Sequence, residues 1–328
     1  MKKTVIITAG AAVLIIALLL GGFPLFSRMV YGRSQAATVF AWQLRKEAYT
    51  TEEAFQEHLA QKRAENSLPY ILPQEATFTV DVNGRMYEDM AYFTLNPSNT
   101  PQTLLFYFPG GSYTDQPRLV HWQFLDKLAA ETGATIIVPV YPKLPLADAE
   151  TAYALLTDFY GDIMAETDCG RLLFMGDSAG GGLALSFAMQ LRAAGIDGPE
   201  ELILLSPWVD VTMSNPDIPA YDKKDSALDA TMLAHLGTLW AGELDPTDPI
   251  VSPLYGSFED LGRVTLVYSR SENLYPDITA LCAALKAAGT EYTTYIEKGM
   301  FHVWPLYVAY DIPETQAAFA YIAAAVAG

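Results

Sequence analysis

The sequence predicts an α/β fold in which a mostly parallel β-sheet is covered by helices on both faces. Short apolar runs alternate with longer helical segments from about residue 103 to residue 297, and such alternation is typical of parallel sheets. Two helical segments, at 191–195 and 285–289, end with a cation followed by glycine, a pattern that favours a left-handed helix cap. The length of 328 residues and the hydrophobic content of 51% suit one large core.

The first 30 residues contain an apolar run without charge from Thr4 to Ser27. At about 1.5 Å per residue, such a run is long enough to cross a hydrocarbon core of about 30 Å. A cleaved signal peptide usually has a shorter run followed closely by small residues, whereas the small residues at 34–36 lie beyond Arg28 and Arg33. The sequence therefore predicts a single-pass anchor over residues 1–30 that binds the cell membrane and leaves the large domain outside the cytoplasm. Secretion after signal cleavage is the alternative.

Residues 36–66 follow with the spacing of an amphipathic helix, because Phe40, Leu44, Phe55 and Leu59 recur at helical intervals between charges. We interpret residues 31–67 as a helical linker or lid ahead of a large domain at 68–328.

Eight strands are predicted in the large domain. The first two, at 77–82 and 86–95, flank Asn83-Gly84, a dipeptide typical of tight hairpin turns. The others are expected at 103–108, 134–140, 171–176, 201–206, 263–269 and 292–297. The proline-rich stretch at about 207–262 is too long for a simple connection and predicts a cap insertion over the C-terminal edge of the sheet.

Charge and cysteine content exclude several classes of function. A formal charge of −18 at pH 7 disfavours nucleic acid as a partner, because phosphate-binding surfaces need clustered Lys and Arg. Cys169 and Cys282 both lie in apolar helical stretches, so we expect small core residues rather than a disulfide framework or a thiolate metal site.

The most informative stretch is 172–181, where an apolar strand leads into Gly-x-Ser-x-Gly around Ser178 and a helix of small residues follows. A sharp strand-to-helix turn holds a serine hydroxyl clear of the sheet. It also places the serine at a helix N-terminus, whose free N–H groups favour a developing oxyanion. The alternative is a serine N-cap on an ordinary turn, but the strand before and the helix after it favour a nucleophile.

With these motifs the chain resembles the hormone-sensitive-lipase-like branch of α/β-hydrolase esterases, which includes carboxylesterases and acetyl-ester deacetylases. The resemblance covers about residues 68–327 and rests on segments at 108–113, 176–181, 206–210, 248–254 and 299–305. It implies an α/β-hydrolase fold with an eight-stranded, mostly parallel sheet and a helical cap. It also implies a serine hydrolase that cleaves small carboxylic esters with short or medium acyl groups through an acyl-enzyme, without a metal or organic cofactor.

Family members carry His-Gly-Gly-Gly after the third strand, and backbone N–H groups there bind the oxyanion together with the N–H that follows the nucleophile. The resemblance places an oxyanion hole at Gly110, Gly111, Ser112 and Ala179, with Pro109 in place of the family histidine. Proline has no N–H, but the donors implied by the family lie later, at Gly111 and Ser112. A simple turn is the alternative interpretation of this segment.

The choice of histidine follows from chain order. Of the four histidines, His58 and His121 precede Ser178, whereas hydrolases of this fold have the order serine, acid, histidine. His235 lies in the predicted cap, before the strand that should deliver the acid. His302 therefore remains as the general base toward Ser178 and the general acid toward the departing alcohol.

Two carboxylates compete for the role of the acid. Glu272 follows the strand that ends near Ser269, and family members place the acid two residues before a leucine, as Glu272 precedes Leu274. Asp277 stands in the first turn of the next helix, where the helix dipole stabilises a carboxylate. Glu272 is therefore the predicted acid and Asp277 the alternative.

Other functions remain open at this point. A ligand-binding or sensor protein can be built on the same fold, and peptidase or thioesterase activity would use the same residues. The sequence does not indicate an oligomeric state.

Overall fold

The structure, a computed structural model, describes residues 21–44, 46 and 51–328. It is built around one eight-stranded sheet with the order β1-β2-β4-β3-β5-β6-β7-β8. Strand β2 pairs antiparallel with β1 and β4, and all the other neighbours are parallel. The strands are β1 (Val82–Tyr87), β2 (Met90–Leu95), β3 (Thr103–Phe108), β4 (Thr135–Pro139), β5 (Arg171–Asp177), β6 (Glu201–Leu205), β7 (Arg263–Ser269) and β8 (Tyr292–Glu297). The predicted mostly parallel sheet is confirmed.

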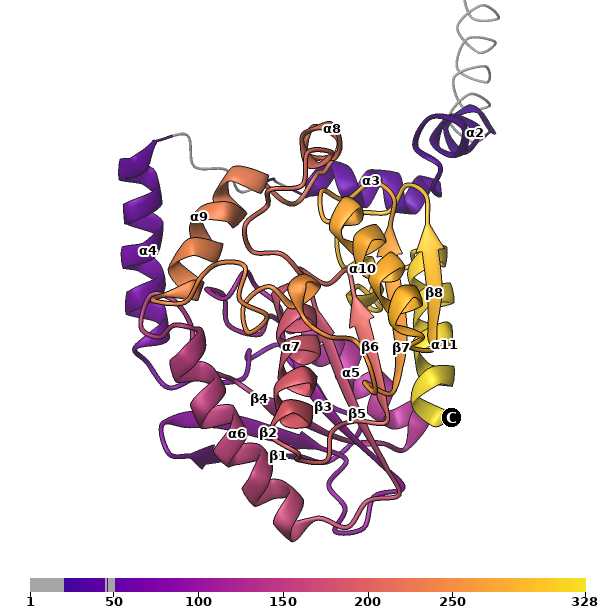
Figure 1. Cartoon of the computed structure of the whole chain (residues 1–328). Helices are drawn as coiled ribbons and strands as arrows, with labels where there is room; N and C mark the ends of the chain where they lie inside the picture. Colours follow the sequence, from indigo (N-terminus) through magenta and orange to yellow (C-terminus); the bar gives the residue numbers. More distant parts are fainter. Residues whose placement is uncertain (1–20, 45, 47–50) are drawn as a thin grey trace, which may run out of the picture.

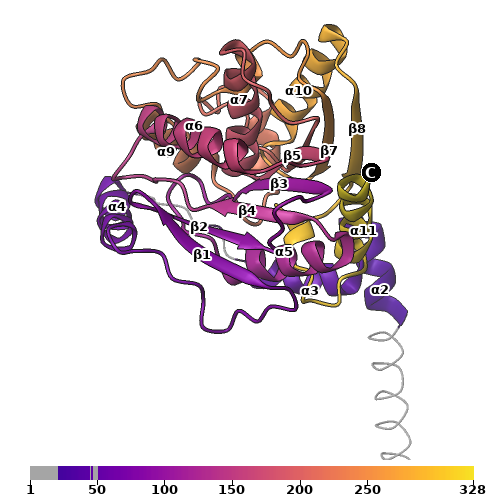
Figure 2. The same ribbon diagram turned by 90° about the horizontal axis from the view of Figure 1, so that it is seen from below.

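Helices cover both faces of this sheet (Figures 1 and 2). One face carries α6 (Ala149–Glu166), α7 (Ala179–Ala193) and α10 (Tyr275–Ala288), and the other carries α5 (Leu119–Thr132) and α11 (Pro313–Ala327). Alternate residues of β3 enter the two cores, because successive side chains of a strand point to opposite faces. Phe106 packs in one core and Tyr107 in the other.

The first hairpin differs from its prediction. Asn83 and Gly84 lie inside β1, and the turn falls at Glu88 and Asp89, where Glu88 has a φ of 49°. Gly84 pairs with Phe93, and a Cβ at Gly84 would lie 2.9 Å from Cε1 of the Phe93 ring. The glycine is therefore used for packing an aromatic ring in the sheet and does not form the turn.

The helix predicted over 36–66 is divided into α3 (Gln35–Gln43) and α4 (Glu52–Asn66). Helix α3 ends because Leu44 is extended, with a ψ of 139°. Each helix has its own N-cap, since Ser34 accepts a hydrogen bond from the N–H of Ala37 and Thr51 accepts one from Ala54. The side chains of Ala37 and Ala41 are buried in the same core as α11.

The predicted membrane anchor is not supported. Residues 1–20 lie outside the described residues, and the described remainder begins with α2 (Phe23–Phe26) and the π-helix η2 (Ser27–Tyr31). The chain then turns at Gly32, which has a left-handed conformation. None of the helices in the described ranges is long and apolar enough to cross a membrane. On this finding the localisation predicted from the sequence, a single-pass anchor in the cell membrane with the large domain outside the cytoplasm, is wrong. The predicted membrane partner is not supported.

The stretch between β6 and β7 contains the short helices α8 (Ile218–Asp222), α9 (Ala230–Ala241) and the 3-10 turn η3 (Pro253–Tyr255). A second 3-10 turn, η4 (Trp304–Leu306), lies between β8 and α11. The helices α8 and α9 lie beyond the carboxyl ends of the parallel strands (Figure 1), the edge where open α/β sheets form their sites.

Candidate active site

Ser178 occupies a sharp turn between β5 and α7. Its φ of 53° and ψ of −123° are rare for a residue with a side chain, and such strain is typical of functional sites. The turn needs glycine on both sides, because a Cβ at Gly176 would lie 2.2 Å from the carbonyl oxygen of Gly180 and one at Gly180 would lie 2.0 Å from that of Phe108. The sequence therefore fixes the serine at the N-terminus of α7, next to the end of β3.

His302 and Glu272 form a buried pair. His302 Nδ1 lies 2.7 Å from Glu272 Oε2, while Glu272 Oε1 accepts hydrogen bonds from Ser206 Oγ at 2.9 Å and from the N–H of Ser269 at 2.8 Å. Because the carboxylate is held from two sides, it fixes the imidazole with its proton on Nδ1. The other ring nitrogen, Nε2, is buried and has no hydrogen-bond partner among the described residues.

Ser178 and His302 line the same cavity of about 130 Å³, together with Gly111 and Ser112. No hydrogen bond joins Ser178 to His302 in the described part of the chain. Such bonds are often long in sites without substrate and shorten only when substrate binds. The cavity therefore brings together the predicted nucleophile, the predicted base and two residues of the predicted oxyanion loop.

Asp277, the alternative acid, lies in the first turn of α10 and has a different partner. Its Oδ1 accepts a hydrogen bond of 2.8 Å from the side chain of Asn215, and its Oδ2 is buried without a partner among the described residues. Burial raises the pKa of Asp277 to about 7. The structure thus brings Glu272, rather than Asp277, to His302.

The predicted oxyanion residues differ in their backbone N–H groups. The N–H of Gly110 donates to Asp177 Oδ1 at 2.9 Å, so it is not free for a ligand. Within the described ranges, no residue accepts a hydrogen bond from the N–H of Gly111, Ser112 or Ala179. Gly111 has a φ of 124° and Ser112 a φ of 52°, and this left-handed run turns the loop toward the cavity.

Asp177, the residue between the glycine and the serine of the motif, braces this loop. Besides Gly110, it accepts a hydrogen bond of 2.6 Å from Tyr107 Oη, and its Oδ2 lies 3.4 Å from His121 Nε2. Burial opposes the charge of Asp177, but the interactions with His121, Tyr107 and Gly110 outweigh it and lower the pKa of the carboxyl. Tyr141 Oη adds a hydrogen bond of 2.8 Å to the carbonyl oxygen of Pro109.

These bracing residues were not predicted from the sequence. His121 was set aside because it precedes the serine, yet it lines the cavity beside Asp177. The sequence places His121 in the first turn of α5, which is only a weak indication that this histidine lies near the site. Neither His235 nor the cysteines line this cavity. Cys169 and Cys282 are half-buried free thiols.

Comparison with known proteins agrees with this fold. The alpha/beta hydrolase fold family matches residues 105–306. The chain is 29% identical to a triacylglycerol lipase of Mycobacterium tuberculosis over 67% of this chain, but it spans only 46% of that lipase. It is also 29% identical to an acetyl-hydrolase of Streptomyces hygroscopicus over 65% of this chain and 72% of the relative.

Comparison with solved structures also indicates an α/β-hydrolase fold. A candidate esterase from Staphylococcus aureus aligns with a TM-score of 0.82 and 26% identity, over 88% of this chain and 98% of that one. An esterase from the bacterial hormone-sensitive lipase family aligns with a TM-score of 0.71 at 20% identity, over 85% and 99% of the two chains, which shows likeness of fold alone. The chain belongs to the alpha/beta hydrolase fold family and is an esterase-type hydrolase.

Proposed function

We propose that this chain hydrolyses small carboxylic esters with short or medium acyl groups, with Ser178 as nucleophile, His302 as general base and Glu272 as the acid that orients it. The observation that carries the proposal is the 2.7 Å contact between His302 Nδ1 and Glu272 Oε2 beside a cavity that both Ser178 and His302 line. Residues 68–328 would form the catalytic domain.

In the proposed reaction, Ser178 Oγ attacks the carbonyl carbon of the ester while His302 Nε2 takes the hydroxyl proton. The imidazolium is stabilised by Glu272, and His302 then gives the proton to the departing alcohol. The acyl group remains on Ser178 until water, activated by the same histidine, releases it as a carboxylic acid.

The negative charge that develops on the carbonyl oxygen needs preorganised donors. We assign this role to the N–H groups of Gly111, Ser112 and Ala179. The N–H of Gly110 is left out because Asp177 accepts its hydrogen bond. Gly110 and Asp177 would instead hold the loop in the conformation that presents the other donors.

The size of the cavity supports a small substrate. Its volume of about 130 Å³ is below the range of about 300–1,000 Å³ that is typical of sites for larger ligands. Leu44 and Met232 form part of its wall. These residues come from the segment 31–67 and the insertion 207–262, which supports our proposal that both parts cover the site.

The experiment that tests this function is a panel of p-nitrophenyl esters of increasing acyl length, run beside labelling with a fluorophosphonate probe. We expect Ser178→Ala to abolish turnover and labelling, because the turn accepts alanine but the nucleophile is lost. Glu272→Gln should reduce kcat by a factor on the order of 1,000 or more, since a neutral amide cannot stabilise the imidazolium.

Asp277→Asn is the matched control for Glu272→Gln, because both replace a buried carboxylate with an amide after β7. A larger loss of kcat in the Asp277 variant would contradict the assignment of the acid. A folded wild-type chain that neither turns over esters nor reacts with the probe would favour a ligand-binding protein.

A further inference from the structure

The residue after the proposed acid is held by carboxylates from the insertion between β6 and β7. Asn273 is fully buried, and its backbone N–H donates to Asp225 Oδ2 at 2.9 Å. Its side-chain Nδ2 donates to Asp222 Oδ1 at 3.0 Å. The loop that carries Glu272 is therefore fixed to the insertion through both the backbone and the side chain of one residue.

Asp225 is itself a buried, well-defined anchor. Its Oδ1 accepts hydrogen bonds from the N–H groups of Ala227 at 2.8 Å and Leu228 at 3.0 Å, and both of these residues line the cavity with Ser178. Burial raises the pKa of Asp225, although His302 and the N–H donors oppose this effect. One carboxylate thus connects the cavity wall with the loop of the proposed acid.

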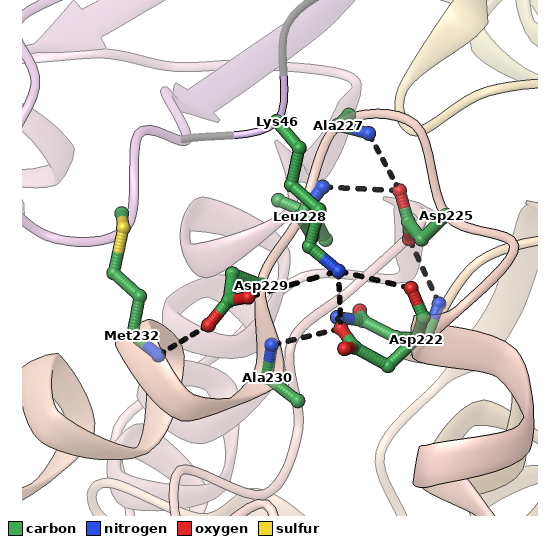
Figure 3. A network of polar contacts seen from close by, with 9 residues as sticks. Lys46, Asp222, Asp225, Ala227, Leu228, Asp229, Ala230 and Met232 are labelled. Carbon is green, nitrogen blue, oxygen red and sulfur yellow. Dashed lines mark hydrogen bonds and ion pairs between the residues drawn. The ribbon is translucent and has the colours of Figure 1, made fainter. Parts of the chain in front are cut away.

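Lys46, from the N-terminal segment, completes the network (Figure 3). Its Nζ lies 2.8 Å from Asp222 Oδ1 and 2.9 Å from the carbonyl oxygen of Asp222, and 3.8 Å from Asp229 Oδ2. The side chains of Lys46 and Asp222 are both 25% exposed, so water screens this contact only in part. Burial opposes the charge of Asp222, but Lys46 and Asn273 outweigh it and lower the pKa of this carboxyl.

The carboxylates of Asp222 and Asp229 both face Lys46. Asp229 also caps α9, since its Oδ1 accepts a hydrogen bond of 2.9 Å from the N–H of Met232, and Asp222 Oδ1 accepts one from the N–H of Ala230 at 2.9 Å. Without the ammonium group the two carboxylates would repel each other across the start of α9. Asp222 would then move away from its present position, and Asn273 would lose the partner of its side chain.

We propose that Lys46, Asp222 and Asp225 are positioning residues that hold Asn273 and thereby fix Glu272 against His302. This inference rests on the proposed function, because it concerns the acid of the same site. The Glu272–His302 contact stabilises the imidazolium that exists only after proton transfer. A displaced Glu272 therefore lowers kcat and leaves substrate binding nearly unchanged.

The test compares Lys46→Met, which keeps the length of the side chain and removes its charge, with Lys46→Arg, which keeps the charge. We expect Lys46→Met to lower kcat for p-nitrophenyl acetate by roughly tenfold with KM changed by less than about twofold, and Lys46→Arg to recover most of kcat. Rates are normalised to the sites titrated by the fluorophosphonate probe, so that loss of folded protein does not count as loss of kcat.

A double-mutant cycle with Asp222→Asn shows whether the loss of kcat in Lys46→Met passes through Asp222. The substitution Asp222→Asn removes the charge but keeps a side-chain oxygen for Asn273, so the double variant Lys46→Met/Asp222→Asn should have a kcat no lower than Lys46→Met alone. Lys127→Met is the matched control, because Lys127 pairs with Glu131 on α5 and lies outside the cavity lining.

The possible outcomes separate the two proposals. Wild-type turnover that is lost in Ser178→Ala, together with an unchanged kcat in Lys46→Met, would overturn the positioning role and leave the proposed function intact. Losses of kcat that are equal in Lys46→Met, Lys46→Arg and Lys127→Met would also overturn it. A wild-type chain without esterase turnover would overturn the proposed function and this inference with it.

Discussion

Lys143 provides a test of the energetics of the core, because we expect Lys143→Met to stabilise the protein below pH 7. The side chain of Lys143 is only 2% exposed, and its Nζ is buried without a hydrogen-bond partner among the described residues. Its Nζ lies 3.3 Å from the centroid of the Tyr141 ring. Burial lowers the pKa of this ammonium group from 10.5 to about 7, although Asp115 and Asp177 oppose the effect.

The magnitude follows from the change in pKa. At about 1.4 kcal/mol for each tenfold change in proton affinity, the lower pKa corresponds to a cost of roughly 5 kcal/mol for holding the charge in the folded state. Methionine removes this cost but loses the cation–π contact, worth about 2 kcal/mol in a buried site, and packs imperfectly, at about 1 kcal/mol. The expected net gain in the free energy of unfolding is about 2 kcal/mol at pH 6.

The stability difference between Lys143→Met and the wild type should decrease as the pH rises above 7. Below pH 7 lysine is charged in both the folded and the unfolded chain, so the wild type carries the full cost of burial. Between pH 7 and 10.5 the unfolded chain binds one more proton, and the stability of the wild type rises with pH. The advantage of Lys143→Met should therefore shrink by about 1.4 kcal/mol for each pH unit above 7.

Urea denaturation at about pH 6 and pH 9 measures both the net gain in stability and its decrease with pH, provided that unfolding is reversible. Lys127→Met serves as the control for removal of an ammonium group, because Lys127 is partly exposed and its replacement relieves no large cost of burial. A methionine variant of Lys143 that is less stable than the wild type at pH 6, or a difference that is the same at both pH values, would refute this reasoning.

Three further predictions concern the site and its surroundings. Gly111→Ala should lower kcat by about a hundredfold, because the new Cβ would lie 2.7 Å from the Cβ of Asp115 and displace the oxyanion loop. Kinetics normalised to titrated sites measure this loss, and an unchanged kcat would contradict the proposed role of the loop. Asp277→Asn should raise the free energy of unfolding by roughly 1–3 kcal/mol at pH 8, because the raised pKa of Asp277 makes its buried charge costly above pH 7. Below about pH 4 the carboxyl is protonated in both states and the gain should disappear, so denaturation at pH 8 and at about pH 4 tests the sign. Asp177→Asn should lower kcat about tenfold and destabilise the chain at neutral pH, because the pKa of Asp177 is lowered and its stabilising charge is lost only in acid. Equal stability of this variant and the wild type at pH 7 would argue against the bracing role of Asp177.

Local patterns explain what could be predicted from the sequence. The six strands from residue 103 onward were found from short apolar runs, and the turn at Ser178 from its glycines, because both depend on neighbours in the chain. Chain order led to His302, and the spacing to Leu274 led to Glu272, which the structure places 2.7 Å apart. Their catalytic roles are the proposal made above.

Contacts between distant segments explain what could not be predicted. Gly84 resembles a turn residue until its partner across the hairpin, Phe93, is known. The N–H of Gly110 looks available until Asp177 is found to accept its hydrogen bond. Lys46 and Asp222 are 176 residues apart, and no periodicity relates them. Each case depends on a pairing that only the folded chain creates.

The brace around Asp177 has a consequence for how this family can vary. The position before the nucleophile is written as x in Gly-x-Ser-x-Gly, as if any residue served there. In this chain it accepts hydrogen bonds from Tyr107 and Gly110 and faces His121. We therefore expect positions 107, 121 and 177 to change together among relatives, so that a lineage that loses the carboxylate also replaces the tyrosine and the histidine.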